Sequence, residues 1–292
     1  MIKKTKHHLL LPFYHSVSDE VHIHIKNLYQ PRSVSQFNAD LDFLLENYKS
    51  ISLERLIEIN KSGEEVRENY FHLTFDDGLS EFYTTVAPIL KERNIHATVF
   101  LNTDFIDNKA LFYRFKASIL HEELKDDALL SITYNESKKL DELALKNSVD
   151  FSAYLKNQQP YLTSEQIRAL INDGFTFGAH SLNHPLYKGV TGEQQLIQTK
   201  ESIEIVTAKF NLDYKVFSFP FTDDGVSKKV FKEIDSFSDM TFGCAGIKED
   251  SANNHLQRVS MEMDKSGEAI IKAEYLYALM KQKMGKNKVV RQ

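Results

Sequence analysis

Short apolar runs that alternate with helical patterns constrain the fold of this chain more than any other feature. Six runs rich in Val, Ile, Phe and Tyr are typical of buried strands: residues 9–14, 70–75, 97–101, 175–179, 215–219 and 240–243. Helical patterns such as QFNADLDFLLENY and YTTVAPILKERN, each with its apolar side chains on one face, lie between several of these runs. Strands that alternate with helices in this way predict an α/β fold.

The composition excludes several classes of protein. Hydrophobic residues make up 42% and charged residues 26% of the 292, which excludes a disordered or collagen-like chain. The formal net charge of −5 argues against a dedicated nucleic-acid binder, because such proteins usually collect a basic face that neutralises phosphates. We therefore expect no nucleic-acid partner.

No stretch has the pattern of a targeting or membrane-spanning segment. The start, MIKKTKHHLLLPFYHSV, is basic, but its apolar run is short, is broken by Pro12 and precedes no small-residue cleavage site. No apolar run approaches the length that spans a bilayer. Cys244 is the only cysteine, so an intramolecular disulfide is impossible. These patterns predict a cytoplasmic protein with no transmembrane segment.

Residues 104–160 differ in composition from the rest of the chain. The segment is mostly charged and helix-favouring, with ESKKLDELALKNS as its most polar part, and it contains no grouped ligand residues. We interpret it as a helical insertion with a covering or spacer role. Because the sequence contains no repeat and no low-complexity linker, we expect one domain over residues 1–292.

Acidic residues and histidines follow the predicted strands. His15 follows the first strand, Asp76 and Asp77 follow the second, and His180 follows the fourth. In α/β barrels the C-terminal ends of the strands carry the catalytic residues, so we expect these side chains to meet at one site. Residues that follow strands are often polar simply because loops are polar, but the concentration of His and Asp favours the functional interpretation.

The adjacent acids and the pair of histidines together indicate a metal site. Coulomb repulsion raises the pKa of one of two neighbouring carboxylates unless a cation or a shared proton stabilises them. His180 and His184 are four residues apart, a spacing that places two imidazoles on the same side of one helical turn. A carboxylate from Asp77 or Asp76 would complete a two-His, one-Asp set with positions left open for water and substrate.

Two signatures occur in order, TFDDG at residues 74–78 and HSLNHP at residues 180–185. In combination they resemble the polysaccharide deacetylases of carbohydrate esterase family 4, which share the NodB homology domain. The resemblance covers roughly residues 9–263. It implies a distorted (β/α) barrel, with residues 104–160 as a helical insertion.

The resemblance also implies roles for the matched residues. Asp76 corresponds to the catalytic base, and Asp77, His180 and His184 correspond to the metal ligands. The implied cofactor is one divalent metal ion. Zinc is the first choice, and a two-His, one-Asp set also accepts cobalt, nickel, manganese or iron.

The chain departs from the family pattern at two points. Where the family has Arg-x-Pro-Tyr this chain reads SFPF, so Ser218 replaces the arginine that orients the base, while Phe221 can still offer a backbone N–H to an oxyanion. Arg258 is the candidate replacement for that arginine. The general acid is assigned to either His15 or His255, and the asparagine-rich surroundings of His255 predict a surface loop.

The function that follows is metal-dependent removal of an acetyl group from an N-acetylated amino sugar or polysaccharide. One alternative keeps the metal and the base but changes the acyl group or the scaffold, giving a deformylase or deacetylase of a lipid-linked or nucleotide-linked sugar. The alternative from another class is a non-catalytic carbohydrate-binding or assembly protein with the same fold. The base beside a complete metal set favours the enzyme, because binding alone does not need a base.

Overall fold

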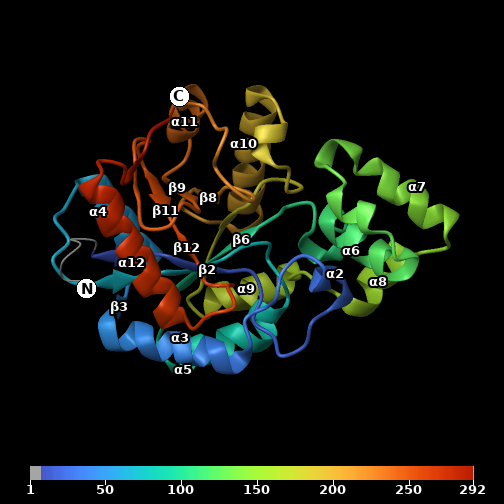
Figure 1. The fold of residues 1–292 in the computed structure, drawn as a ribbon, viewed down its shortest axis with the longest axis horizontal. Coiled ribbons are helices and arrows are strands. Elements are labelled where there is room, and N and C mark those ends of the chain that lie inside the picture. Colours follow the sequence, from blue (N-terminus) through green and yellow to red (C-terminus); the bar gives the residue numbers. More distant parts are fainter. Residues whose placement is uncertain (1–7, 292) are drawn as a thin grey trace.

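The computed structural model describes residues 8–291, and Figure 1 shows a central sheet with helices around it and a helical lobe at one side. The sequence predicts no signal peptide at the start of the chain. Residues 1–7 of that stretch lie outside the described residues. Eight strands form the central sheet in the order β11-β9-β8-β7-β6-β5-β2-β12, and all neighbours are parallel. Their bounds are β2 Pro12–Tyr14, β5 Leu73–Phe75, β6 Ala97–Leu101, β7 Thr176–Ala179, β8 Val216–Ser218, β9 Met240–Gly243, β11 His255–Gln257 and β12 Val259–Ser260.

The connection between the two edge strands brings the edges of this sheet together. One residue, Arg258, separates β11 from β12, although these strands stand at opposite ends of the strand order. The backbone N–H of Arg258 donates to the Gly243 carbonyl at 3.2 Å, and that of Val259 donates to the Leu11 carbonyl at 2.9 Å. The sheet is therefore nearly closed, and the predicted distorted (β/α) barrel is confirmed.

Helices cover the outside of the barrel (Figure 1). In the helix α3 a capping box between Ser33 and Gln36 fixes the start, and Phe37, Leu41 and Leu44 point into the core. The helices outside the lobe are α3 Val34–Asn47, α4 Leu53–Ser62, α5 Ala87–Glu92, α9 Ser164–Asn172, α10 Gly192–Phe210, α11 Lys228–Asp235 and α12 Gly267–Lys283, with the short η1 Phe82–Val86, η2 Ile106–Asn108 and η5 Tyr187–Gly189. Within residues 8–291, no helix is both long enough and apolar enough to cross a membrane.

Two of the predicted strands are each two strands in the structure. The run 9–14 divides into β1 (Leu9–Leu10) and β2, and the run 70–75 divides into β4 (Tyr70–Phe71) and β5. The first halves pair with each other, and β4 also pairs with β3 (Lys49–Ser50), in a small separate sheet, whereas the second halves enter the barrel. A further pair joins β10 (Glu249–Asp250) to β13 (Lys288–Val289) near the C-terminal end of the chain.

Apart from η2, the segment predicted to be helical forms the lobe at the right of Figure 1. It contains α6 Tyr113–Leu124, η3 Asp127–Ser131, η4 Tyr134–Glu136, α7 Lys138–Lys146 and α8 Phe151–Gln158. The N-terminal helix α2 (Ile23–Lys26) packs against α6. Phe115, Leu120 and Leu140 form an apolar cluster of the lobe together with Ile25 of α2. The lobe thus has its own small core, which fixes α6 beside the C-terminal ends of the barrel strands.

Candidate active site

The turn after β5 directs the two adjacent acids into the barrel mouth. Asp77 has a φ of 69° and Gly78 a φ of 64°, both in the left-handed region. The turn favours glycine for its conformation, and a Cβ on Gly78 would also lie 2.7 Å from Cδ2 of Leu101, so that side chain would have to move. The strained backbone at Asp77 is typical of a functional site, where the surrounding structure must hold a sparsely populated conformation.

The two histidines lie on an irregular loop after β7. The spacing argument placed them on one helical turn, and this detail is wrong because the residues just after β7 form no helix. Ser181 and His184 have φ values of 73° and 63°, and the Ser181 hydroxyl accepts the backbone N–H of His184 at 2.9 Å. This tight fold of the loop turns both imidazoles toward Asp77.

Asp77, His180 and His184 converge, and all three are buried. Oδ1 of Asp77 lies 3.2 Å from Nε2 of His184 and 3.7 Å from Nε2 of His180. The Ser218 carbonyl can only accept, so the 2.8 Å contact of His180 Nδ1 with it requires that Nδ1 carry the proton. The lone pair of His180 Nε2 then points at the Asp77 carboxylate, with no hydrogen bond to either Asp77 Oδ1 or His180 Nε2 among the described residues.

These three side chains fit a divalent metal ion. Two buried acceptor atoms that face each other need a cation, and a backbone carbonyl that fixes the other ring nitrogen is the usual partner of a metal-bound histidine. Burial lowers the pKa of His180 to about 4, so the imidazole is neutral at pH 7, as a ligand must be. Burial raises the pKa of Asp77, but the nearby histidines outweigh it and hold that pKa well below its usual range.

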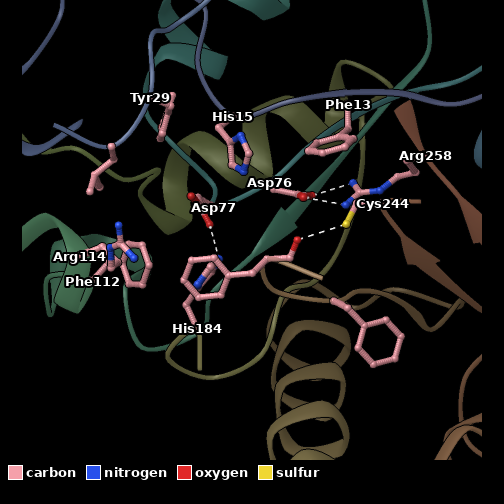
Figure 2. Close-up of a pocket in the computed structure, with 13 residues that line it drawn as sticks. Phe13, His15, Tyr29, Asp76, Asp77, Phe112, Arg114, His184, Cys244 and Arg258 are labelled. Carbon is pink, nitrogen blue, oxygen red and sulfur yellow. Dashed lines mark hydrogen bonds and ion pairs between the residues drawn. The ribbon is translucent and has the colours of Figure 1, made fainter. Parts of the chain in front are cut away.

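Asp76 makes a two-pronged ion pair with Arg258 (Figure 2). Nη1 of Arg258 donates to Oδ1 at 2.8 Å and Nη2 donates to Oδ2 at 2.7 Å, while Ser218 accepts from Nη2 at 2.7 Å. Burial raises the pKa of Asp76, but the Arg258 guanidinium outweighs burial and lowers it overall. Asp76 is therefore held as a carboxylate in a fixed orientation beside the three candidate metal ligands.

His15 lies at the end of β2 and projects into the same pocket (Figure 2). Its Nδ1 is 2.5 Å from Oε2 of Glu262, and Oε1 of Glu262 accepts the backbone N–H groups of His15 and Ser16. Burial alone would lower the pKa of His15, but the Glu262 carboxylate raises it to about 10. His15 is thus a partly buried imidazolium held by a buried carboxylate. Glu262 was not predicted from the sequence, where no local pattern marks it.

Phe221 follows β8 and has a φ of 58°. Its carbonyl accepts from Sγ of Cys244 at 3.2 Å, and its ring lies 4.5 Å from the His184 ring. Among the described residues no hydrogen bond engages its backbone N–H, which is therefore available to a ligand. The structure thus places Phe221, His15, Asp76, Asp77 and Arg258 around one pocket.

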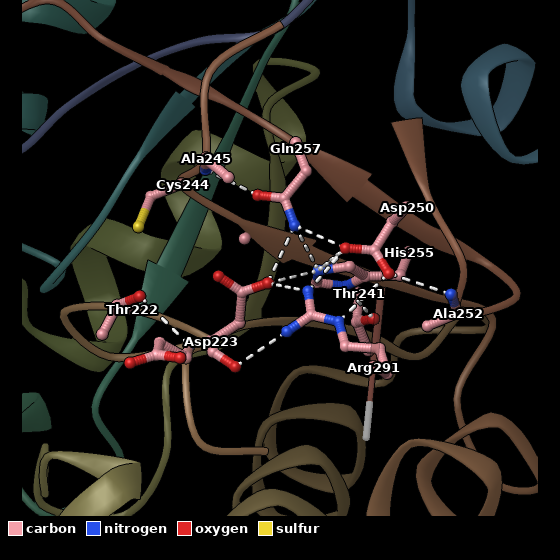
Figure 3. Close-up of polar contacts among 12 residues, drawn as sticks. Thr222, Asp223, Thr241, Cys244, Ala245, Asp250, Ala252, His255, Gln257 and Arg291 are labelled. Atoms are coloured by element: carbon pink, nitrogen blue, oxygen red, sulfur yellow. Dashed lines mark hydrogen bonds and ion pairs between the residues drawn. The ribbon is translucent and has the colours of Figure 1, made fainter. Parts of the chain in front are cut away.

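His255 lies outside this pocket, and the prediction of a surface loop around it is wrong. The residue begins β11, which pairs with β9, and its side chain is buried. Nδ1 of His255 is 2.7 Å from the Thr241 hydroxyl, and Nε2 is 3.0 Å from Oδ2 of Asp223. Strand pairing therefore turns the imidazole into a separate polar cluster (Figure 3), and only His15 of the two candidate general acids reaches the pocket.

Comparison with known proteins identifies the family to which this chain belongs. The sequence model of the polysaccharide deacetylases matches residues 63–237, which is more than half of the chain. The chain belongs to the polysaccharide deacetylase family. A Bacillus subtilis protein named for the same family, YxkH, is 21% identical over 220 residues, which cover 74% of this chain. The matched region spans only 58% of the length of YxkH.

Several solved structures share the fold, among them those of two proteins named as deacetylases. PplD, a deacetylase of Streptococcus pyogenes solved with acetate, is 16% identical with a TM-score of 0.61 over 90% of this chain and 96% of its own. IcaB of Ammonifex degensii is 13% identical with a TM-score of 0.61 over 91% of this chain and 97% of its own. A de-N-acetylase of Aggregatibacter actinomycetemcomitans is 16% identical with a TM-score of 0.60, over 91% and 99%. At these identities the likeness establishes the fold.

A second group of two aspartates and one histidine already has an arginine that balances the charge of its carboxylates. Asp223, Asp250 and His255 lie close enough together to hold a metal ion. The Arg291 guanidinium, however, contacts both carboxylates, with Nη2 at 2.5 Å from Oδ2 of Asp250 (Figure 3). A cation therefore occupies the place where a metal would bind, and this group is a buried ion-pair cluster that ties the chain end to the loop of Phe221.

Replacing Arg291 by Met is expected to lower the free energy of unfolding by roughly 3–5 kcal/mol, because two buried carboxylates lose their cation. The quantity to measure is the free energy of unfolding in urea. Arg55→Met is the matched control. Arg55 pairs with Glu64 on the surface, and its loss is expected to cost less than about 1 kcal/mol. Equal losses in the two variants would contradict the assigned role.

Proposed function

We propose that this protein is a metal-dependent amide hydrolase that removes the acetyl group from an N-acetylated amino sugar. The observation that carries the proposal is Asp76, an oriented and ionised carboxylate beside the Asp77, His180 and His184 set. A protein that only binds carbohydrate has no use for this second carboxylate, whereas hydrolysis needs it as a base. Membership of the polysaccharide deacetylase family supports the same reaction class.

Asp77, His180 and His184 would hold the metal. Zinc is the first choice for a two-His, one-Asp set, and cobalt, nickel, manganese or iron also suit it. When bound, such an ion polarises the amide carbonyl and makes water more acidic. The His180 tautomer fixed by the Ser218 carbonyl presents the required lone pair.

The other residues of the pocket supply the remaining steps. Asp76 accepts the proton of the attacking water, and Arg258 holds its two oxygens in place during the transfer. The backbone N–H of Phe221 donates to the oxyanion that forms when the water oxygen bonds to the acetyl carbon. His15, protonated through its contact with Glu262, gives a proton to the sugar nitrogen as the carbon–nitrogen bond breaks.

Acetate release tests this proposal. Metal-reconstituted protein is incubated with N-acetylglucosamine oligomers and with nucleotide-linked N-acetylated amino sugars, and acetate and free amine are quantified together. The proposal predicts equal amounts of both products from at least one substrate. Release of formate from N-formylated analogues, without release of acetate, would show that the acyl group is formyl rather than acetyl. The absence of any amide cleavage would contradict the proposal.

Replacing Glu262 by Gln is expected to move the alkaline limb of the pH profile of kcat/KM to lower pH. A general acid must be protonated, so the rate falls as the pH rises through the pKa of His15. Glu262 raises that pKa against the effect of burial, and without the carboxylate burial lowers it. An alkaline limb at the same pH in wild type and Glu262→Gln would show that His15 is not the general acid.

A further inference from the structure

The pocket contains one charge that the proposed reaction does not use, the guanidinium of Arg114. This residue belongs to α6 in the helical lobe, and it lines the same cavity as Asp76, Asp77 and His184 (Figure 2). Its Nε is buried and has no hydrogen-bond partner among the described residues. The guanidinium donates to the hydroxyl oxygen of Tyr113, but burial raises the pKa of that hydroxyl, so the contact supplies no negative charge.

The other charged groups of the pocket are already engaged, either in ion pairs or at the candidate metal site. Arg258 pairs with Asp76, and Glu262 pairs with His15. Asp77 faces the two histidines of the candidate metal site. Among residues 8–291, no carboxylate makes an ion pair with Arg114, so its positive charge has no counter-ion in this cavity. A partly buried cation without a counter-ion is costly, and an anionic ligand would remove that cost.

The position of Arg114 relative to the candidate metal site is fixed by aromatic packing. The neighbouring Phe112 places its ring 4.4 Å from the His184 ring, and its backbone N–H donates to the Tyr161 hydroxyl at 3.0 Å. Phe115 and Tyr161 stack at 5.9 Å on the inner side of α6. The backbone that carries Arg114 therefore belongs to a well-packed wall of the pocket, as suits a group that selects substrates.

The rest of the cavity suits a sugar ring. Its volume is about 330 Å³, and Leu28, Tyr29 and Phe221 give it apolar and aromatic surfaces. Aromatic rings pack against the apolar face of a sugar, while polar groups at the edges fix its orientation. An amino sugar whose acetamide lies at the candidate metal site would thus meet a cation on the lobe side of the pocket.

We propose that Arg114 binds an anionic group, a carboxylate or a phosphate, on the amino sugar substrate or on the unit next to it. The proposal rests on the proposed function, because it places the acetamide at the candidate metal site. A planar guanidinium offers paired N–H donors that match two oxygens of either group, which an ammonium cannot do. The substrate class is therefore an anionic N-acetylated amino sugar.

Substrate preference tests the assignment. The kcat/KM of wild type is measured for N,N′-diacetylchitobiose, for a disaccharide of the same length that contains N-acetylmuramic acid, and for UDP-N-acetylglucosamine. We expect one of the two anionic substrates to exceed the neutral one by about 10-fold or more, the size of a charge-assisted contact. A carboxylate source and a phosphate source are distinguished by which of the two is preferred.

Variants assign that preference to Arg114. In Arg114→Gln the ratio of anionic to neutral kcat/KM is expected to fall by about 10-fold, mainly through KM, whereas Arg114→Lys retains part of it because the charge stays. Lys139→Gln is the matched control, because it removes one cation from α7 at an exposed surface pair with Glu136. Its ratio is expected to equal that of wild type. An unchanged ratio in Arg114→Gln, or a wild type that prefers the neutral disaccharide, would overturn the proposal.

A binding measurement separates this proposal from the proposed reaction. Calorimetric titration of UDP-N-acetylglucosamine and of glucuronic acid compares wild type with Arg114→Gln, whose fold is checked by its thermal melting curve. Weaker binding by the variant supports the anion site even if no acetate is released from any substrate. If neither probe binds wild type more tightly than Arg114→Gln, the anion site is refuted, whatever the acetate assay gives.

Discussion

Replacing Asp76 by Asn is expected to lower kcat by roughly 10²- to 10⁴-fold, the usual contribution of a positioned general base. The amide has the shape of the carboxylate but cannot take a proton from water. Because Asp76 is not among the three candidate ligands, the metal content is expected to stay that of wild type. The measurement is kcat for acetate release together with bound metal in the same preparation.

Asp224→Asn is the matched control for this substitution. Asp224 lies on the surface in an ion pair with Lys188, so the same chemical change there is expected to leave kcat within a factor of about two. Comparable activity in Asp76→Asn and wild type would remove Asp76 from the role of base. Loss of bound metal in Asp76→Asn would instead indicate that Asp76 is a metal ligand.

Replacing Arg258 by Met is expected to lower the free energy of unfolding by roughly 3–5 kcal/mol, because it leaves Asp76 as an unpaired buried charge. The same substitution is expected to change the pH dependence of kcat/KM. The lowered pKa of Asp76 keeps the base ionised in wild type down to acidic pH, and without Arg258 burial raises that pKa unopposed. The acid limb of kcat/KM is therefore expected to move to higher pH.

The sign of the stability change follows from the same shift. In wild type the lowered pKa of Asp76 contributes stability above the pKa of the unfolded chain, and that contribution is lost as the pH falls toward the folded value. Arg258→Met is expected to remove it at neutral pH. Arg291→Met is the control, because it breaks another buried ion pair outside the pocket and is expected to leave the acid limb in place. An acid limb that stays in place in Arg258→Met would contradict the orienting role of Arg258.

The fold was predictable wherever the sequence carries a local period. All six predicted strands occur, although two of them divide into two strands each. β11 and β12 were missed because residues 255–260, HLQRVS, are mostly polar and contain no apolar run like those of the predicted strands. Their absence from the prediction explains why His255 was placed on the surface although strand pairing buries it.

The candidate site was predictable where a motif is local and not where barrel closure creates it. The spacing of His180 and His184 correctly indicated their proximity, although a loop with two left-handed residues brings them together rather than a helical turn. Arg258 was considered only because Ser218 stands where the family has an arginine. The contact of Glu262 with His15 spans 247 residues, and no sequence period can reveal it.

The central claim is that acetate release depends on a metal held by Asp77, His180 and His184. The most direct measurement is bound transition metal and acetate release for wild type and His180→Ala, before and after chelation and after reconstitution. The account predicts about one metal per wild-type chain, activity that disappears and returns with the metal, and neither metal nor activity in His180→Ala. Full acetate release by chelated wild type, or by His180→Ala, would contradict it.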